Sequence, residues 1–169
     1  MRKGLQILFI TILVLIIGYF AYNQFSIRSI SSDYQILPEF TLNDVNGAKF
    51  NSSQISRDKQ KLLIYFDSEC EHCLEEAAAI SKHIDSFKNI QLLFISYQEP
   101  EAITEFAETY HFLSLPNAVF LEDKYLQLVS AFNIKEFPFM LLYSKDNKLI
   151  QKFEGPTDVE ILLKSINKI

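Results

Sequence analysis

Apolar side chains follow two different spacings along this sequence, one typical of buried strands and one typical of helices. Residues 61–66 and 90–97 are nearly continuous apolar runs, with the length of strands that are buried on both faces. Residues 138–143 and 148–153 are predicted to form two more strands around a turn. Upstream, residues 38–54 alternate apolar and polar positions around an Asn-Gly turn, which predicts a short hairpin.

Helical spacing separates these predicted strands. From Cys73 onward, apolar residues recur every three or four positions, and a second helix is predicted to begin at Pro100. A third helix is expected over residues 123–132, and Thr157 and Glu160 have the spacing of a capping box before a last helix. The predicted order is a hairpin followed by β, α, β, α, α, β, β and α, which indicates an α/β sandwich with a mixed sheet.

The amino-terminal stretch has the length and composition of a membrane span. Residues 5–22 carry no charge and are interrupted only by Gln6 and Thr11. An 18-residue helix spans roughly 27 Å, close to the hydrocarbon thickness of a bilayer. Arg2 and Lys3 precede the stretch, so the positive-inside bias places the N-terminus in the cytoplasm and the following domain outside.

An uncleaved anchor, a cleaved signal peptide and a buried core helix are the alternatives for this stretch. Cleavage needs small residues two positions apart, and Tyr19 and Gln24 occupy the positions where small residues would be needed. We therefore expect residues 1–23 to be a single-pass anchor in the cytoplasmic membrane. Residues 24–35 are then a polar tether, and residues 36–169 form one domain on the periplasmic side.

Composition and charge indicate which classes of protein that domain can belong to. Three of the 16 basic residues and none of the 21 acidic residues lie within the first 30 positions, so the remainder has a net charge of −8. A domain this acidic lacks the basic surface that nucleic-acid binding requires, which excludes nucleic acid as a partner. With 49% hydrophobic and 22% charged residues, it has the composition of a packed domain.

The two cysteines, Cys70 and Cys73, are three positions apart, after the predicted strand 61–66 and at the first turn of a helix. There Cys70 meets unpaired backbone N–H groups and the positive end of the helix dipole, which favour the thiolate, the nucleophile of disulfide exchange. Cys73 lies one turn further and is less exposed. We predict that Cys70 attacks and Cys73 releases, and that the Cys70–Cys73 disulfide acts without another cofactor.

Other residues around the motif would either stabilise or destabilise a Cys70 thiolate. Protonated His72 would stabilise a Cys70 thiolate, and the alternative is an exposed loop histidine with no effect. Carboxylates around the motif oppose thiolate formation. They are Asp67, Glu69, Glu71, Glu75 and Glu76. The sign of the net effect stays open.

Three separate motifs carry a resemblance to a known family. The run LLIYFDSECEHCLEEAA, the downstream pair Phe137-Pro138 and the upstream PEFTLNDVNG resemble membrane-anchored thioredoxin-like proteins of the TlpA/ResA type, over about residues 36–169. The resemblance implies a thioredoxin-like α/β sandwich with an N-terminal β-hairpin extension, preceded by one transmembrane helix. It also implies a thiol–disulfide oxidoreductase that acts on protein thiols outside the cytoplasmic membrane, with a membrane or periplasmic electron donor or acceptor as partner.

The resemblance also assigns roles to single residues. Pro138 matches the cis-proline that faces the C-x-x-C loop, where the backbone of Phe137 would pair with an extended substrate strand. Glu76 matches an acidic residue near the active site that assists proton movement.

Alternative uses of the cysteine pair follow from the same residues. A structural disulfide closing so small a loop removes little entropy from the unfolded chain. A zinc site needs four ligands, and His83 and His111 are poorly placed to complete one, so no metal is expected. A peroxiredoxin-like thiol peroxidase stays open, although Asp67 stands where peroxiredoxins have Thr. A non-catalytic binding or copper-delivery module also stays open, although copper-delivery relatives have a wider cysteine spacing.

Overall fold

The computed structural model describes Gln6, residues 11–19 and residues 34–168. The chain divides into two compact units, Met1–Asp33 and Tyr34–Ile169. In the first unit, residues 11–19 are helical and their side chains are exposed. Most of the predicted anchor (1–23) and tether (24–35) lies outside the described residues. None of the helices within the described ranges combines the length and the apolar character needed to cross a bilayer.

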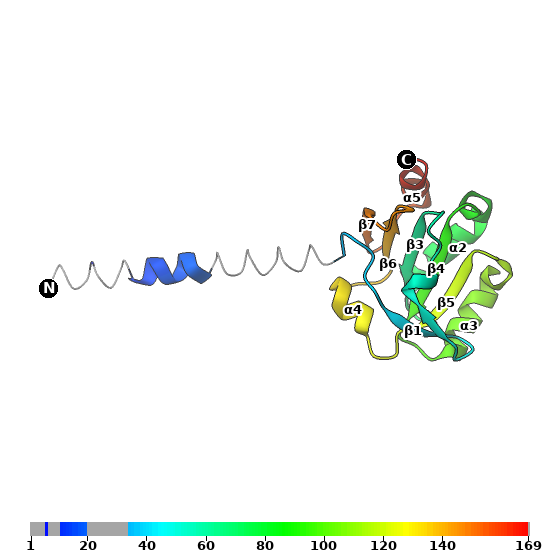
Figure 1. The fold of residues 1–169 in the computed structure, drawn as a ribbon, viewed down its shortest axis with the longest axis horizontal. Coiled ribbons are helices and arrows are strands. Elements are labelled where there is room, and N and C mark those ends of the chain that lie inside the picture. The colour runs from blue at the N-terminus through cyan, green and yellow to red at the C-terminus, as the bar shows by residue number, and fades with distance from the viewer. Residues whose placement is uncertain (1–5, 7–10, 20–33, 169) are drawn as a thin grey trace. The chain divides into compact units, whose positions relative to one another are not determined.

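The second unit is built on a mixed sheet of seven strands in the order β2-β1-β5-β4-β3-β6-β7 (Figure 1). The strands are β1 Thr41–Asp44, β2 Lys49–Asn51, β3 Lys61–Tyr65, β4 Gln91–Ser96, β5 Ala118–Glu122, β6 Phe139–Tyr143 and β7 Leu149–Glu154. Strands β3, β4 and β5 are parallel, whereas β6 is antiparallel to β3 and β1 is antiparallel to β5. The α/β class and the mixed sheet predicted from the sequence are confirmed.

Helices cover both faces of this sheet because its central strands alternate their apolar side chains between two cores. The helices are α2 Glu71–Lys82, α3 Pro100–Thr109, α4 Gln127–Phe132 and α5 Val159–Ile166, with short 3-10 turns at Ser52–Gln54, Ile84–Phe87 and Phe112–Ser114. From β3, Leu62 and Ile64 join the core that holds buried residues of α2, α3 and α5. Leu63 and Tyr65 join the second core, which α4 and the segment before β1 complete.

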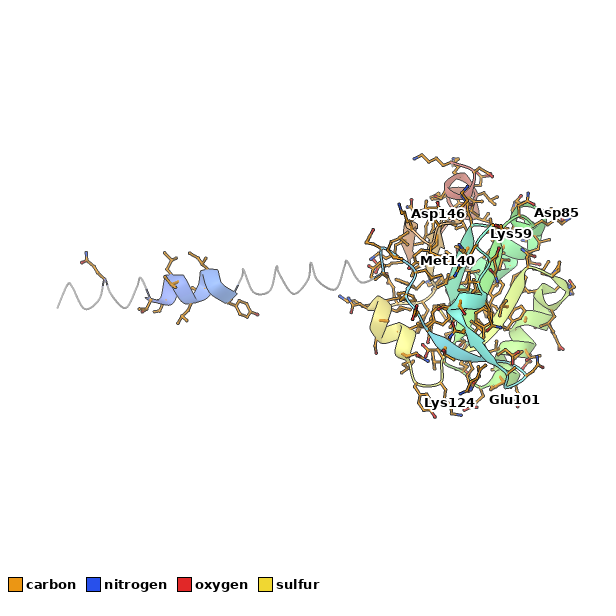
Figure 2. The ribbon with its side chains drawn as sticks, viewed as in Figure 1. Lys59, Asp85, Glu101, Lys124, Met140 and Asp146 are labelled. Carbon is orange, nitrogen blue, oxygen red and sulfur yellow. The ribbon has the colours of Figure 1, made fainter. Side chains whose placement is uncertain are left out.

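Charged residues lie at both ends of the strands. Figure 2 shows Lys59, Asp85 and Asp146 toward one end of this unit and Glu101 and Lys124 toward the other. The second end is where the parallel strands finish. In open α/β sheets, this carboxyl edge is where functional groups gather.

Strand β5 was not predicted, and the helix expected over residues 123–132 is shorter. Residues Ala118–Glu122 pair with β4 and β1, so the sheet has one more strand than the sequence pattern indicated. Helix α4 begins only at Gln127 because the Asp123 carboxylate accepts the backbone N–H groups of Gln127 and Leu128, both at 2.9 Å. Asp123 therefore ends the strand and fixes the start of the helix.

The predicted capping box of Thr157 and Glu160 is wrong. The N-cap of α5 is Asp158, whose carboxylate accepts the backbone N–H of Glu160 at 2.8 Å. The Thr157 hydroxyl instead donates to the carbonyl of Gly155 at 3.2 Å. A carboxylate is the better acceptor here because it also complements the helix dipole, so the helix starts one residue later than the motif suggested.

Candidate active site

The two cysteines stand at the start of helix α2, at the carboxyl edge of the sheet. Cys70 is the N-cap residue, with extended backbone angles (φ −82°, ψ 118°), and its carbonyl accepts the backbone N–H of Leu74 at 3.1 Å. Its side chain makes no capping hydrogen bond and is half-buried. Cys73 lies in the first turn with 2% of its surface exposed. Both residues are free thiols in this structure.

Each thiol contacts a backbone group from a different segment. The Cys70 thiol donates to the carbonyl of Phe137 across 3.8 Å, a long contact between sulfur and oxygen. The Cys73 sulfur accepts the backbone N–H of Asp67 at 3.5 Å. Burial raises the pKa of Cys73 to about 12, and the Asp67 N–H offsets this only partly. Cys73 is therefore a neutral thiol at physiological pH, beside a more accessible partner.

The segment before β6 forms the other wall of the site. The Phe137–Pro138 bond is cis, as expected from the sequence, and Pro138 borders the contact between Phe137 and Cys70. The Phe137 ring is stacked on Tyr65, with ring centroids 5.7 Å apart, and lies 6.0 Å from the ring of Tyr97. These aromatic contacts hold the Phe137 carbonyl next to the more exposed thiol.

Asp67 connects two segments of the site through hydrogen bonds that the sequence does not predict. Its Oδ1 accepts the backbone N–H of Glu69 at 2.8 Å, and its Oδ2 accepts the hydroxyl of Tyr97 at 2.6 Å. The bond to Asp67 raises the pKa of Tyr97 to about 12, with burial adding to the shift. Tyr97 was missed altogether. It directly follows β4 at the same sheet edge as Cys70, and that position was the signal in the sequence.

Glu76 is buried on α2, with 6% of its surface exposed and no hydrogen-bond partner for either carboxylate oxygen. Burial raises the pKa of Glu76 to about 7, although the nearby backbone N–H of Thr157 favours the charged form. It lines a cavity of about 360 Å³ between α2 and the start of α5, together with His72 and Thr157.

His72 lies on the outside of α2, with 56% of its side chain exposed. Its Nδ1 is 3.3 Å from Oε2 of Glu75, one turn further along the helix. The structure thus pairs the imidazole with a neighbouring carboxylate of the same helix. An effect of His72 on Cys70 stays a prediction.

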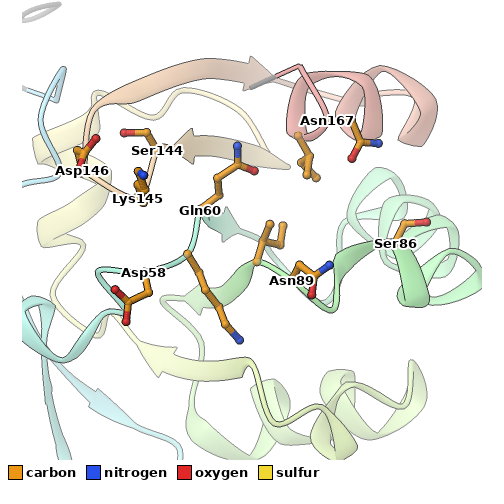
Figure 3. Close-up of a pocket in the computed structure, with 11 residues that line it drawn as sticks. Asp58, Gln60, Ser86, Asn89, Ser144, Lys145, Asp146 and Asn167 are labelled. Atoms are coloured by element: carbon orange, nitrogen blue, oxygen red, sulfur yellow. The ribbon is translucent and has the colours of Figure 1, made fainter.

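The described part of the chain holds no cluster of three or more His, Cys, Asp and Glu side chains suited to a metal ion. A cavity of about 530 Å³ lies at the opposite edge of the sheet. Figure 3 shows the residues that line it. Its lining includes Asp58, Ser144, Lys145 and Asp146, which precede β3 or follow β6. Neither cysteine is among the residues that line this cavity.

The arrangement at the carboxyl edge suits thiol–disulfide exchange. A half-buried thiol at a helix N-terminus is accessible to another sulfur, and a second thiol one turn away is shielded from solvent. The carbonyl of Phe137 offers an acceptor beside the accessible thiol. An incoming disulfide therefore meets Cys70 before it meets Cys73.

Solved structures with this fold are numerous. A secreted disulfide oxidoreductase of Mycobacterium tuberculosis homologous to E. coli DsbE is 18% identical, and the match covers 82% of this chain and 98% of that one, with a TM-score of 0.66. The peroxidoxin BcpB of Mycobacterium tuberculosis is 17% identical over 79% of this chain and 95% of its own, with a TM-score of 0.68. Copper-bound ScoI of Arabidopsis thaliana is 16% identical over 78% and 98%, with a TM-score of 0.62.

At these identities the likenesses show the fold alone, which is the expected α/β thioredoxin-like fold. A search of curated proteins found no match. A family model does match, and it covers residues 34–161, well over half of the sequence and nearly all of the second unit. The chain therefore belongs to the AhpC/TSA family, a thioredoxin-like family of redox proteins.

Proposed function

We propose that this protein is a thiol–disulfide oxidoreductase that exchanges the Cys70–Cys73 pair with thiols and disulfides of other proteins. The observation that supports it best is the contrast between the two sulfurs. Cys70 is half-buried at the start of α2, and Cys73 is 2% exposed one turn later. This division provides one sulfur that attacks and one that resolves.

The exchange proceeds in two balanced steps. The Cys70 thiolate attacks a substrate disulfide, forms a mixed disulfide and releases one substrate sulfur as a thiolate, which takes up a proton. Cys73 then loses its proton and attacks the Cys70 sulfur, which forms the Cys70–Cys73 disulfide and frees the second substrate sulfur. Two electrons and two protons pass from the dithiol to the substrate, and the reverse sequence oxidises a substrate dithiol.

Glu76 is the proposed proton acceptor for the second step. Cys73 needs a base because its pKa is raised to about 12, whereas the pKa of Glu76, about 7, lets this carboxyl take up or give off a proton near neutral pH. Glu76 is three residues beyond Cys73, on the neighbouring turn of the same helix. Phe137 and Pro138 are the proposed binding site for an extended substrate segment, with the Phe137 carbonyl as the acceptor of its backbone N–H.

We place this exchange outside the cytoplasmic membrane, with the N-terminus inside. The uncharged stretch of residues 5–22 supports a single-pass anchor, and the fold is shared with a disulfide oxidoreductase described as secreted. The partners are then protein thiols or disulfides at the outer surface of the membrane, and a membrane or periplasmic electron donor or acceptor.

Reduction of insulin disulfides by dithiothreitol tests the proposal. Wild-type protein should accelerate precipitation of the insulin B chain, and Cys70→Ser should abolish this acceleration. Cys73→Ser should also lose turnover. When this variant is reduced and then freed of dithiothreitol before insulin is added, it should accumulate a mixed disulfide with the substrate, since Cys70 attacks and no second thiol resolves the product. Full activity of the Cys70→Ser variant would contradict the proposal.

A thiol peroxidase is the second candidate, favoured by the AhpC/TSA family match. It predicts that hydrogen peroxide oxidises Cys70 to a sulfenic acid, which Cys73 then converts to the disulfide with loss of water. Peroxide-dependent consumption of thiols, without acceleration of insulin reduction, would identify this activity. Retention of copper on a desalting column would instead favour a metal-delivery module.

A further inference from the structure

Tyr97 contacts both segments whose backbone groups bond to the two thiols. Its hydroxyl donates to Asp67, whose backbone N–H bonds the sulfur of Cys73. Its ring lies 6.0 Å from that of Phe137, whose carbonyl faces the sulfur of Cys70. One side chain from the loop after β4 thus connects the loop before α2 with the segment before β6.

We propose that Tyr97 is a positioning residue that sets the redox equilibrium of the Cys70–Cys73 pair through Asp67. The inference rests on the proposed function in so far as that equilibrium serves disulfide exchange. Within the described residues, the hydrogen bond of the Tyr97 hydroxyl goes to Asp67 and to neither reacting sulfur. Its influence passes through the carboxylate that it binds.

The direction of the effect follows from the charge of Asp67. The Asp67 carboxylate raises the pKa of Cys73, so it opposes a thiolate in the reduced pair and disfavours the dithiol form relative to the disulfide. A hydrogen bond from Tyr97 withdraws negative charge from Oδ2 and holds the loop so that the backbone N–H points at Cys73. Both effects favour the reduced pair. Removal of the hydroxyl therefore shifts the equilibrium toward the disulfide.

A second tyrosine–aspartate pair in the same fold shows what a purely structural contact looks like. The Tyr65 hydroxyl donates to Asp123 at 2.9 Å, but Asp123 is fully buried and also accepts two backbone N–H groups of α4. Tyr97 is 37% exposed, and Asp67 lies in the loop that carries Cys70. The Tyr97–Asp67 pair is thus at the rim of the site, where loss of one hydroxyl leaves the core intact.

The test is the equilibrium of the full-length protein with reduced and oxidised glutathione, read out by the ratio of dithiol to disulfide. Tyr97→Phe keeps the ring on Phe137 and removes only the hydroxyl. We expect it to shift the equilibrium about fivefold toward the disulfide, which is about 20 mV for a two-electron couple. Asp67→Asn removes the charge and should shift the equilibrium in the opposite direction.

The double variant Tyr97→Phe/Asp67→Asn separates action through the charge from a general loosening of the loop. In the Asp67→Asn background, the further effect of Tyr97→Phe should fall below twofold, because the charge that the hydroxyl moderates is gone. Tyr125→Phe is the matched control, since Tyr125 is 84% exposed and also follows a strand at this sheet edge. It should leave the equilibrium unchanged.

The outcomes distinguish this inference from the proposed function. A Tyr97→Phe shift below twofold, or an equal shift in the Asp67→Asn background, overturns the role of Tyr97 even if the wild type reduces insulin. A wild-type protein that equilibrates with glutathione but does not reduce insulin contradicts the proposed function instead. Far-UV circular dichroism and the urea midpoint establish that each variant is folded.

Discussion

Burial gives three neighbouring side chains at the start of helix α2 three different chemical characters. Cys70 is half-buried, Cys73 is 2% exposed, and Glu76 is 6% exposed with both carboxylate oxygens unbonded. An unpaired buried carboxylate is costly, and the group avoids the cost by keeping its proton. The burial of single side chains therefore sets the reactivity of the thiols and the pH dependence of the fold.

The order of alkylation tests the assignment of the two sulfurs. At pH 7, iodoacetamide should modify Cys70 at least tenfold faster than Cys73, because Cys73 is shielded and its pKa is raised to about 12. Peptide mapping by mass spectrometry at short reaction times gives both rates. Denatured protein, in which both thiols are exposed, is the control. Modification of Cys73 first would reverse the roles.

The pKa of Glu76 makes the stability of the fold depend on pH in a defined direction. The folded chain holds this proton up to a pH of about 7, whereas the unfolded chain loses it near 4.5. Stability from this group is therefore present below pH 4.5 and is lost as the pH rises through 7. The free energy of unfolding should fall by about 3 kcal/mol over that range.

Urea unfolding of Glu76→Gln at pH 4 and pH 8 measures this contribution. The amide has no proton to lose, so the difference in free energy between the two pH values should change by about 3 kcal/mol relative to the wild type. Glu75→Gln is the control, because its carboxylate is 67% exposed and should leave the difference unchanged. If the free energy of unfolding depended on pH identically in the wild type and in Glu76→Gln, the buried carboxyl would not be the cause of that dependence.

At the scale of elements, carboxylates that bind backbone N–H groups decide where helices begin. Asp123 fixes the start of α4, and Asp158 caps α5. Helix α2 is different, because its N-cap is Cys70 and the side chain makes no capping bond. The first turn of α2 thus keeps its N–H groups free to favour negative charge on an attacking sulfur.

Replacement of the α5 cap tests which residue starts that helix. Asp158→Ala should lower the free energy of unfolding by about 1 kcal/mol, because it removes the acceptor for the backbone N–H of Glu160. Glu160→Ala should cost less than about 0.5 kcal/mol, since its side chain has no role in the cap. Chemical denaturation at pH 7 compares the two. If Glu160→Ala lowered the free energy of unfolding more than Asp158→Ala does, the capping box of Thr157 and Glu160 would be the correct assignment.

The sequence pattern located most elements because strands buried on both faces read as apolar runs. Residues 61–66 and 90–97 became β3 and β4 with only small changes at their ends. Strand β5 was not predicted because Ala118 and Val119 are only half-buried and its apolar run is short. Its pairing with β1 and β4 is long-range, and local spacing does not report such contacts.

At the scale of the whole molecule, the topology assembles a site from segments far apart in the sequence. Cys70 follows β3, Tyr97 follows β4, and Pro138 precedes β6, which runs antiparallel to β3. The cysteine pair and Pro138 were found from motifs. The link from Tyr97 to Asp67 was not, because a side-chain hydrogen bond across 30 positions leaves no periodic trace in the sequence.

We expect the predicted anchor to determine where this site works. Residues 5–22 carry no charge, while the rest of the chain after residue 30 is strongly acidic, so attraction to anionic lipid headgroups cannot hold the protein on a membrane. Full-length protein should therefore stay in the membrane fraction in 1 M salt and be released only by detergent. A chain that begins at Tyr34, the start of the second compact unit, should stay in the supernatant. Release of the full-length chain by salt alone, or mature protein whose first residue lies beyond position 20, would show that residues 5–22 do not anchor it.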